Sequence, residues 1–141
     1  MKKAFFDTWA WVAIAHEDDN HHKEANSFYK KFLISKGLPV TTDYVLAETI
    51  TLLRARLDFG DAEVFMDTLI LAAKEGKIML ERIDDRRWTK AWEMSKKYHD
   101  KPYISFFDFT SFVVMKEVNV LDVLTADKHF EDIGMGFRKL F

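Results

Sequence analysis

Short apolar runs alternate with longer segments of helical period along this chain. The first run, residues 3–6, ends at the acid Asp7, and three more occupy residues 38–40, 78–83 and 120–124. In the segments between them, apolar side chains recur every three or four residues, which indicates helices. Strands that alternate with helices favour a central, mostly parallel sheet with helices on both faces. The predicted fold class is therefore α/β, a three-layer α/β/α sandwich.

The helix starts follow from residues that can cap them. In chain order, the expected N-terminal caps are Thr8, Asp19 or Asn20, Thr42, Asp84 and Ser105. Ser105 and Asp108 have the spacing of a capping box. The break Phe59-Gly60-Asp61 predicts that a fourth helix starts after it, and a short helix is expected over residues 128–133.

Length and composition restrict the class of protein further. The chain has 141 residues, 48% of them hydrophobic, so we expect one domain with a core over residues 1–141. Without Cys there is no disulfide, thiolate metal site or cysteine nucleophile. Lys2-Lys3 and the apolar residues after them imitate a secretory signal, but Asp7 interrupts the run. No apolar stretch reaches the ~20 residues of a membrane-spanning helix, and we expect a soluble, cytoplasmic protein.

Four acids stand at positions where this fold binds ligands. Asp7 and Asp127 follow the carboxyl ends of predicted strands, the edge at which parallel sheets bind ligands. Asp108 falls in the first turn of a predicted helix. Glu48 lies among the apolar residues of another helix, where an acid is rarely buried unless it is paired or binds a metal. We expect these acids to meet at one site.

Three of the four acids also have an evident structural alternative. Asp108 fits the third helical position of a capping box, and Asp127 can cap the short helix after it. Glu48 can lie half exposed at the edge of its apolar stripe. Asp7 has no evident structural task, because it is an acid at the end of a strand, between Phe6 and Trp9.

The acidic motifs occur in a characteristic order. They are Asp7-Thr8 after an apolar run, Glu48 in an apolar helix, Ser105-Phe106-Phe107-Asp108 at a helix start, and Thr125-Ala126-Asp127. This set resembles the four acidic motifs of the PIN domain family. The ending Asp127-Lys128-His129-Phe130, followed by Gly136-Phe137, is similar to the C-terminal signature of the VapC-type toxins in that family. The resemblance covers essentially the whole chain.

The resemblance implies a Mg²⁺- or Mn²⁺-dependent endoribonuclease with one or two ions. The implied catalytic and metal-binding residues are Asp7, Glu48, Asp108 and Asp127, with Asp7 and Asp108 the most direct ligands. Thr8 and Thr125 would orient carboxylates or waters behind them. Physical chemistry agrees, because hard divalent cations prefer oxygen ligands and relieve the repulsion of converging carboxylates. With water as the nucleophile, the expected products carry 5′-phosphate and 3′-hydroxyl ends.

The resemblance also implies partners. It suggests the toxin of a type II toxin–antitoxin pair, with an RNA substrate, an antitoxin that blocks the site, and a homodimer. A stand-alone PIN-domain nuclease in RNA processing is the alternative. The net charge of −2 does not oppose RNA binding, since setting aside the four acids leaves 19 acids against 21 bases.

Residues outside the acidic motifs give weaker indications. Arg54 and Lys128 are the candidate RNA-binding residues. His129 faces the substrate, the solvent or the packed interior. The aromatic residues Trp88, Trp92, Phe106, Phe109 and Phe112 recur at helical spacing and are expected in the core.

Two other classes share an acid after the first strand. A phosphatase of the haloacid dehalogenase type needs a second Asp two residues after the first, where this chain has Trp9. A phospho-acceptor receiver domain is a non-enzymatic alternative with an acidic pocket. Glu48 on a helix and Asp108 at a helix start do not fit its plan.

Overall fold

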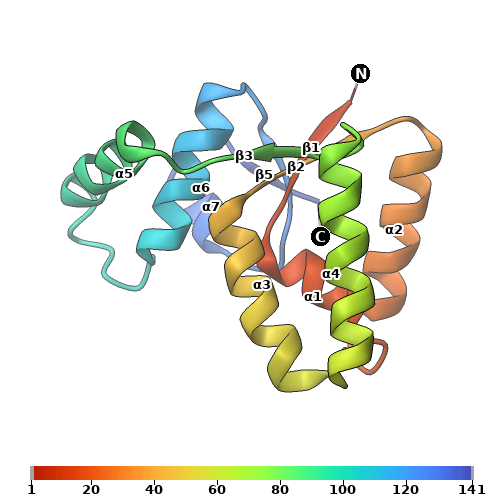
Figure 1. The fold of residues 1–141 in the computed structure, drawn as a ribbon. Helices are drawn as coiled ribbons and strands as arrows, with labels where there is room; N and C mark the ends of the chain where they lie inside the picture. Colours follow the sequence, from red (N-terminus) through yellow and green to blue (C-terminus); the bar gives the residue numbers. More distant parts are fainter. Residues whose placement is uncertain (1, 141) are drawn as a thin grey trace.

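Five strands form one sheet at the centre of the computed structural model, which describes residues 2–140 (Figure 1). Seven helices surround the sheet in this part of the chain. In order, the elements are β1 (Lys3–Phe6), α1 (Thr8–Ala15), α2 (His22–Ile34), β2 (Leu38–Thr42), α3 (Asp43–Arg56), α4 (Phe59–Lys74), β3 (Met79–Glu81), α5 (Asp85–Lys97), α6 (Phe106–Glu117), β4 (Asp122–Leu124), α7 (His129–Asp132) and β5 (Arg138–Lys139).

The sheet has the order β3-β2-β1-β4-β5, and all of its strand pairs are parallel. From β1 the chain moves to β2 and β3 on one side, then returns to place β4 on the other side of β1. This change of direction creates a crevice at the carboxyl ends of β1 and β4, where sheets of this type bind ligands. In the register of these strands, Phe6 stands opposite Leu124.

Successive side chains of β1 point to opposite faces of the sheet, and each enters an aromatic cluster. Phe6 packs against Trp11 and Phe32 at ring-centroid distances of 4.9 and 5.7 Å. Phe5 faces Phe130 of α7 at 6.4 Å. Helices α1 and α2 therefore cover one face, while α6 and α7 cover the other (Figure 1). This confirms the predicted α/β/α sandwich.

Several helix starts differ from the predicted ones. The first helix begins at Thr8, with Asp7 rather than Thr8 as its N-cap. The second begins at His22, after a turn in which Asp19 accepts a hydrogen bond from the backbone N–H of His21 at 2.8 Å. Helix α4 begins at Phe59, because a glycine at the second position of a helix leaves its first turn intact. The predicted domain, 1–141, includes two terminal residues outside the described range.

The predicted caps Thr42, Asp84 and Ser105 are confirmed. Each side chain accepts a hydrogen bond from a backbone N–H in the first turn of its helix. The capping box of Ser105 and Asp108 is present in both directions. No helix within residues 2–140 is both long and apolar enough to cross a membrane.

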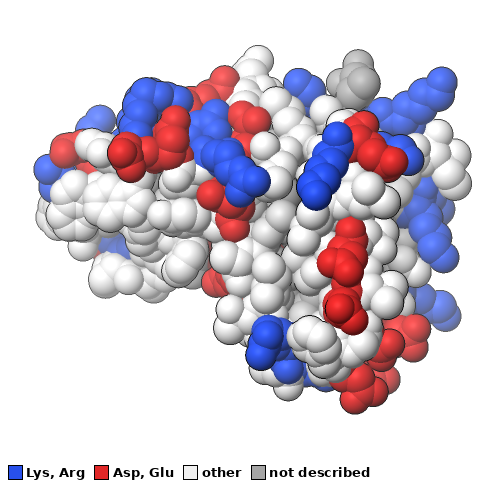
Figure 2. Space-filling view, viewed as in Figure 1, with Lys and Arg blue, Asp and Glu red and all other residues white. Residues whose placement is uncertain are grey.

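Helix α5 lies at one end of the molecule and is joined to α6 by ion pairs (Figure 1). Glu117, at the end of α6, accepts hydrogen bonds from Arg86, from Arg87 Nε at 2.8 Å and from Lys90 Nζ at 3.0 Å. These bonds, that of Arg86 first, lower the pKa of Glu117 to about 2. Figure 2 shows basic and acidic side chains interspersed over this region.

Replacing Glu117 by Gln is expected to destabilise the protein by about 1–2 kcal/mol at pH 7. The pKa of Glu117 is lowered by folding, so its contribution is present above pH 4.5 and is lost as the pH falls toward 2. Urea denaturation at pH 7 and pH 3 should show a difference from wild type that shrinks at the lower pH. Glu63→Gln, on the exposed surface of α4, is the control; a pH-independent difference for Glu117→Gln would contradict the assignment.

Candidate active site

A cleft of about 490 Å³ at the carboxyl ends of β1 and β4 brings the four predicted acids together. Its lining includes Asp7, Glu48, Asp108 and Asp127, and also Thr8. The acids come from four separate elements: the β1–α1 junction, α3, the first turn of α6 and the β4–α7 loop. The topology therefore assembles residues up to 120 positions apart in the sequence into one acidic surface.

Asp7 is held at the end of β1 by both backbone and side-chain bonds. Its carbonyl accepts the N–H of Ala10 at 2.9 Å, so Asp7 starts α1 while its carboxylate remains available to the cleft. The hydroxyl of Thr125 donates to Asp7 Oδ2 at 3.0 Å. Asp7 thus occupies the N-cap position of α1, but its side chain makes no capping hydrogen bond there.

The electrostatics around Asp7 are those of crowded carboxylates. Burial, followed by the charge of Asp108, raises the pKa of Asp7 from 3.8 to about 7, and Glu48 adds to the rise. Hydrogen bonds from the backbone of Thr8 and the side chain of Thr125 oppose this rise. A cation bound here would relieve the repulsion and favour the ionised carboxylate.

Glu48 enters the cleft from the middle of α3. Thr8 Oγ1 donates a hydrogen bond to Glu48 Oε1 at 2.6 Å, which joins the start of α1 to α3. Glu48 is half-buried, as its structural alternative proposed, yet it also lines the cleft. The bond leaves the second carboxylate oxygen, Oε2, for a metal or a metal-bound water.

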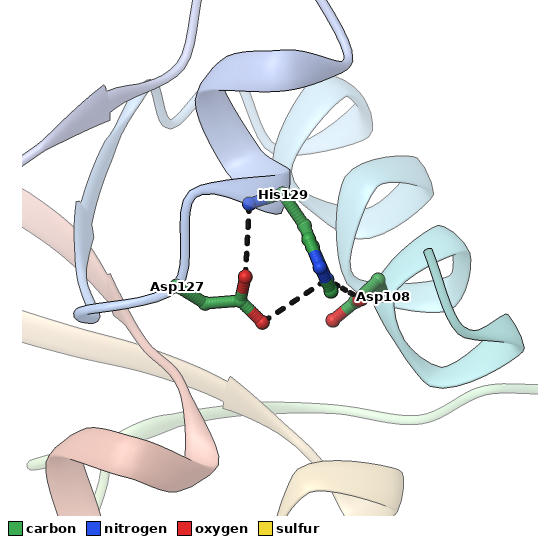
Figure 3. A group of neighbouring side chains, drawn as sticks. All are labelled: Asp108, Asp127 and His129. Carbon is green, nitrogen blue, oxygen red and sulfur yellow. Dashed lines mark hydrogen bonds and ion pairs between the residues drawn. The ribbon is translucent and has the colours of Figure 1, made fainter. Parts of the chain in front are cut away.

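Figure 3 shows Asp108, Asp127 and His129 pointing toward one another. His129 Nδ1 lies 2.9 Å from Asp108 Oδ2 and 3.2 Å from Asp127 Oδ2. The same Asp108 oxygen accepts the N–H of Ser105 at 3.2 Å, so Asp108 serves both the capping box and the cleft. Asp127 Oδ1 accepts the N–H of His129 at 2.9 Å and so bonds to the start of α7.

Thr125 connects the two sides of the site. Its hydroxyl donates to Asp7 and accepts the backbone N–H of Asp127 at 3.0 Å, and the residue is fully buried. One hydroxyl therefore fixes the carboxylate after β1 and the loop after β4. Both threonines predicted to support the acids, Thr8 and Thr125, are placed to do so.

The resemblance to PIN domains implies RNA cleavage, and Thr125→Val is expected to lower that activity about 10- to 100-fold, the usual cost of losing a residue that orients a metal ligand. Valine fills the same space, so the fold is retained while Asp7 and the Asp127 backbone each lose a partner. Steady-state cleavage assays and circular dichroism should show the effect in kcat with little change in secondary structure. Thr49→Val, a buried threonine whose hydroxyl bonds only within α3, is the matched control; equal activity of the two variants would contradict this role.

The sequence does not decide where His129 lies, and it does not identify several other residues that line the cleft, Tyr44, Phe107 and Ser111 among them. Phe107 and Tyr44 stand edge to face at 5.9 Å beside the acids, and Ser111 lies one turn after Asp108. The spacing of His129, two residues after Asp127, is the signal that could have placed its ring beside the acids. The others depend on packing between helices.

The aromatic prediction was correct in part. Phe109 and Phe112 are buried in the core, and Phe106 is partly buried against Trp88 at 5.1 Å. Trp88 and Trp92 are about half exposed, however, and Ala91 is the one fully buried residue of α5. Helical spacing identified the apolar face but not how completely α6 covers it.

The two candidate RNA-binding residues do not line the cleft. Lys128 is exposed in the loop between Asp127 and His129, at the edge of the cleft. Arg54 is exposed near the end of α3, where its guanidinium lies 5.7 Å from the centre of the Phe59 ring. A role for either in binding RNA stays a prediction.

Comparison with known proteins matches most of this chain to a domain family and to relatives of similar length. The PIN domain family model matches residues 4–135. Two curated relatives, both described as 23S rRNA-specific endonuclease VapC20, come from the CDC 1551 / Oshkosh and H37Rv strains of Mycobacterium tuberculosis. Each is 30% identical over 131 residues, covering 92% of this chain and 93% of the relative.

A solved structure agrees. The crystal structure of Mycobacterium tuberculosis VapC20, described as a sarcin–ricin loop cleaving toxin, superposes with a TM-score of 0.77 at 30% identity. The match covers 93% of this chain and 95% of the other. These findings confirm the family that the acidic motifs indicated.

Proposed function

This chain belongs to the PIN domain family, and we propose that it is a metal-dependent endoribonuclease that acts as the toxin of a type II toxin–antitoxin pair. The observation that carries the proposal is the convergence of Asp7, Glu48, Asp108 and Asp127 on one cleft at the change of direction in the sheet. Such a surface of half-buried carboxylates suits a hard divalent cation.

The donor set fits Mg²⁺ or Mn²⁺, one ion or two. Asp7 and Asp108 would hold the cation most directly, with Glu48 and Asp127 binding directly or through water. When bound, the cation would supply a Lewis acid that activates water and neutralises charge on the phosphoryl oxygens. Thr125 keeps Asp7 oriented, and the bond from Thr8 fixes one oxygen of Glu48.

The relatives suggest the substrate class. VapC20 is described as specific for 23S rRNA and as cleaving the sarcin–ricin loop. We propose that this chain likewise cuts a structured RNA in the cytoplasm, as a homodimer held inactive by an antitoxin. Lys128, beside the cleft, and Arg54, at the end of α3, are proposed to contact the phosphate backbone.

Incubation of purified protein with ribosomal and transfer RNA, in Mg²⁺ or Mn²⁺ and in excess EDTA, tests this function. We expect discrete cuts with 5′-phosphate and 3′-hydroxyl ends, identified by sequencing of the fragments, and no cuts in EDTA. Cleavage that persists in EDTA would refute the metal mechanism. Cyclic-phosphate ends would refute attack by water.

A further inference from the structure

His129 places an imidazole nitrogen between two of the four acids (Figure 3). We propose that Asp108, Asp127 and His129 form a mixed carboxylate–imidazole site that binds a divalent cation through His129 Nδ1 and prefers Mn²⁺ to Mg²⁺. The proposal rests on the proposed function, because it names a ligand and a metal preference for the same cleft. It adds a nitrogen ligand to a set otherwise made only of oxygens.

The fold fixes all three side chains from different directions. Asp108 is held at the start of α6 by Ser105, and Asp127 by the backbone N–H of His129. The His129 ring lies 5.4 Å from the ring of Tyr103 and keeps 27% of its side chain exposed. The site is therefore formed before a ligand arrives and remains open to solvent.

The distances suit a shared cation as well as a shared proton. Nδ1 is 2.9 Å from the Asp108 oxygen and 3.2 Å from the Asp127 oxygen. Two ligands at right angles on an ion, with bonds of about 2.1 Å, lie about 3 Å apart. The ligand atoms of the three residues all lie within 4.8 Å of one another. An ion can thus replace the Nδ1 proton with small side-chain adjustments.

The nitrogen determines which ion is preferred. Mg²⁺ binds oxygen ligands in a strict octahedral arrangement and retains several waters. Imidazole binds divalent first-row transition metals, of which Mn²⁺ is the weakest binder, and it adds still less to Mg²⁺ binding. In the tautomer that carries the imidazole proton on Nε2, the Nδ1 lone pair faces the two acids and can bind the ion. The same cleft would therefore bind Mn²⁺ more tightly than Mg²⁺.

A purely positioning role for His129 is the competing explanation. In that case Nδ1–H would donate to both carboxylates and never contact the metal. Gln at position 129 retains an amide donor for the carboxylates but has no imidazole nitrogen. The variant His129→Gln therefore separates the two roles.

Pulsed electron paramagnetic resonance of the protein loaded with Mn²⁺ tests the proposal without an activity assay. We expect a ¹⁴N coupling from a directly bound imidazole in wild type and in the control His99→Gln, whose histidine is exposed in the turn after α5 and does not line the cleft. The coupling should be absent in His129→Gln. The wild-type spectrum decides the question even if that variant folds poorly.

Calorimetric titration with each metal gives a second readout. His129→Gln should weaken Mn²⁺ binding by at least about 10-fold and Mg²⁺ binding much less. Saturable Mn²⁺ binding without ¹⁴N coupling, or equal losses for both metals, would overturn the nitrogen ligand and leave the ribonuclease proposal intact. Absence of saturable binding of either metal would overturn both proposals.

Discussion

Replacement of Asp7 by Asn is expected to lower metal-dependent RNA cleavage about 10³-fold. The carboxylate lies at the carboxyl end of β1, where it faces Asp108 across the cleft and is oriented by Thr125. Asparagine keeps the shape and the hydrogen bond but not the charge that a divalent cation requires. A metal stabilises charge in the transition state by several kcal/mol, and each 1.36 kcal/mol is tenfold in rate.

The same substitution is expected to stabilise the metal-free protein. Because the pKa of Asp7 is raised by folding from 3.8 to about 7, the folded state retains a proton that the unfolded chain has lost. Wild-type stability therefore falls as the pH rises from about 4 to about 7. A pKa raised this far corresponds to a loss of at most about 4 kcal/mol in the free energy of unfolding. Asp7 is only half-buried, so solvent screens its charge and the effect is smaller. We expect Asp7→Asn to raise the free energy of unfolding by about 1–2 kcal/mol at pH 8.

Denaturation in EDTA at pH 4 and pH 8, together with cleavage assays in Mg²⁺ and Mn²⁺, measures both effects. The gain in stability of Asp7→Asn should be small at pH 4 and full at pH 8. RNA cleavage by this variant should be lost with Mg²⁺ and with Mn²⁺. Asp67→Asn, exposed on α4, should change neither quantity. An equal gain at both pH values would show that the raised pKa of Asp7 is not its cause.

Much of the site could be predicted because it depends on strand ends. Asp7 and Asp127 follow parallel strands, and parallel strands place their carboxyl ends at one edge of the sheet. The capping box identified the start of α6 to the residue, which placed Asp108 in its first turn. The apolar surroundings of Glu48 then indicated an acid that needs a partner, which the structure supplies in Thr8.

The remaining features depend on contacts between elements that no local pattern specifies. The bridging position of His129 requires the distance between α6 and the β4–α7 loop, which the sequence does not give. The exposure of Trp88 and Trp92 depends on how far α5 projects beyond α6. Similarly, Arg54 contacts Phe59 because α4 starts earlier than its glycine suggested.

Replacement of Asp108 by Asn is expected to separate the two roles of this residue. Asparagine retains a side-chain oxygen that can accept the N–H of Ser105, so the capping box survives and stability should change by less than about 1 kcal/mol. The charge is lost, and with it the most direct partner of Asp7 for a metal. We therefore expect cleavage to fall about 10³-fold, as for Asp7→Asn.

Ser105→Ala is the matched variant, because it removes the cap and leaves the charge. Loss of a serine cap costs about 1 kcal/mol, so Ser105→Ala should be less stable yet retain most of the cleavage rate when folded. If Ser105→Ala lost activity as completely as Asp108→Asn, the effect of Asp108 would be structural.

The pKa of Asp7 separates the two roles of Asp108, because loss of its capping role alone would not change that pKa. The charge of Asp108 is the second cause of its rise, after burial. In Asp108→Asn the pKa of Asp7 should fall below 7 but stay above 3.8, because burial remains. A ¹³C titration of the Asp7 carboxyl by nuclear magnetic resonance, in EDTA, follows this change, and Ser105→Ala should leave it near the wild-type value. A shift in Asp108→Asn alone would establish that the two carboxylates interact through charge across the cleft, which is the repulsion that a bound cation would relieve.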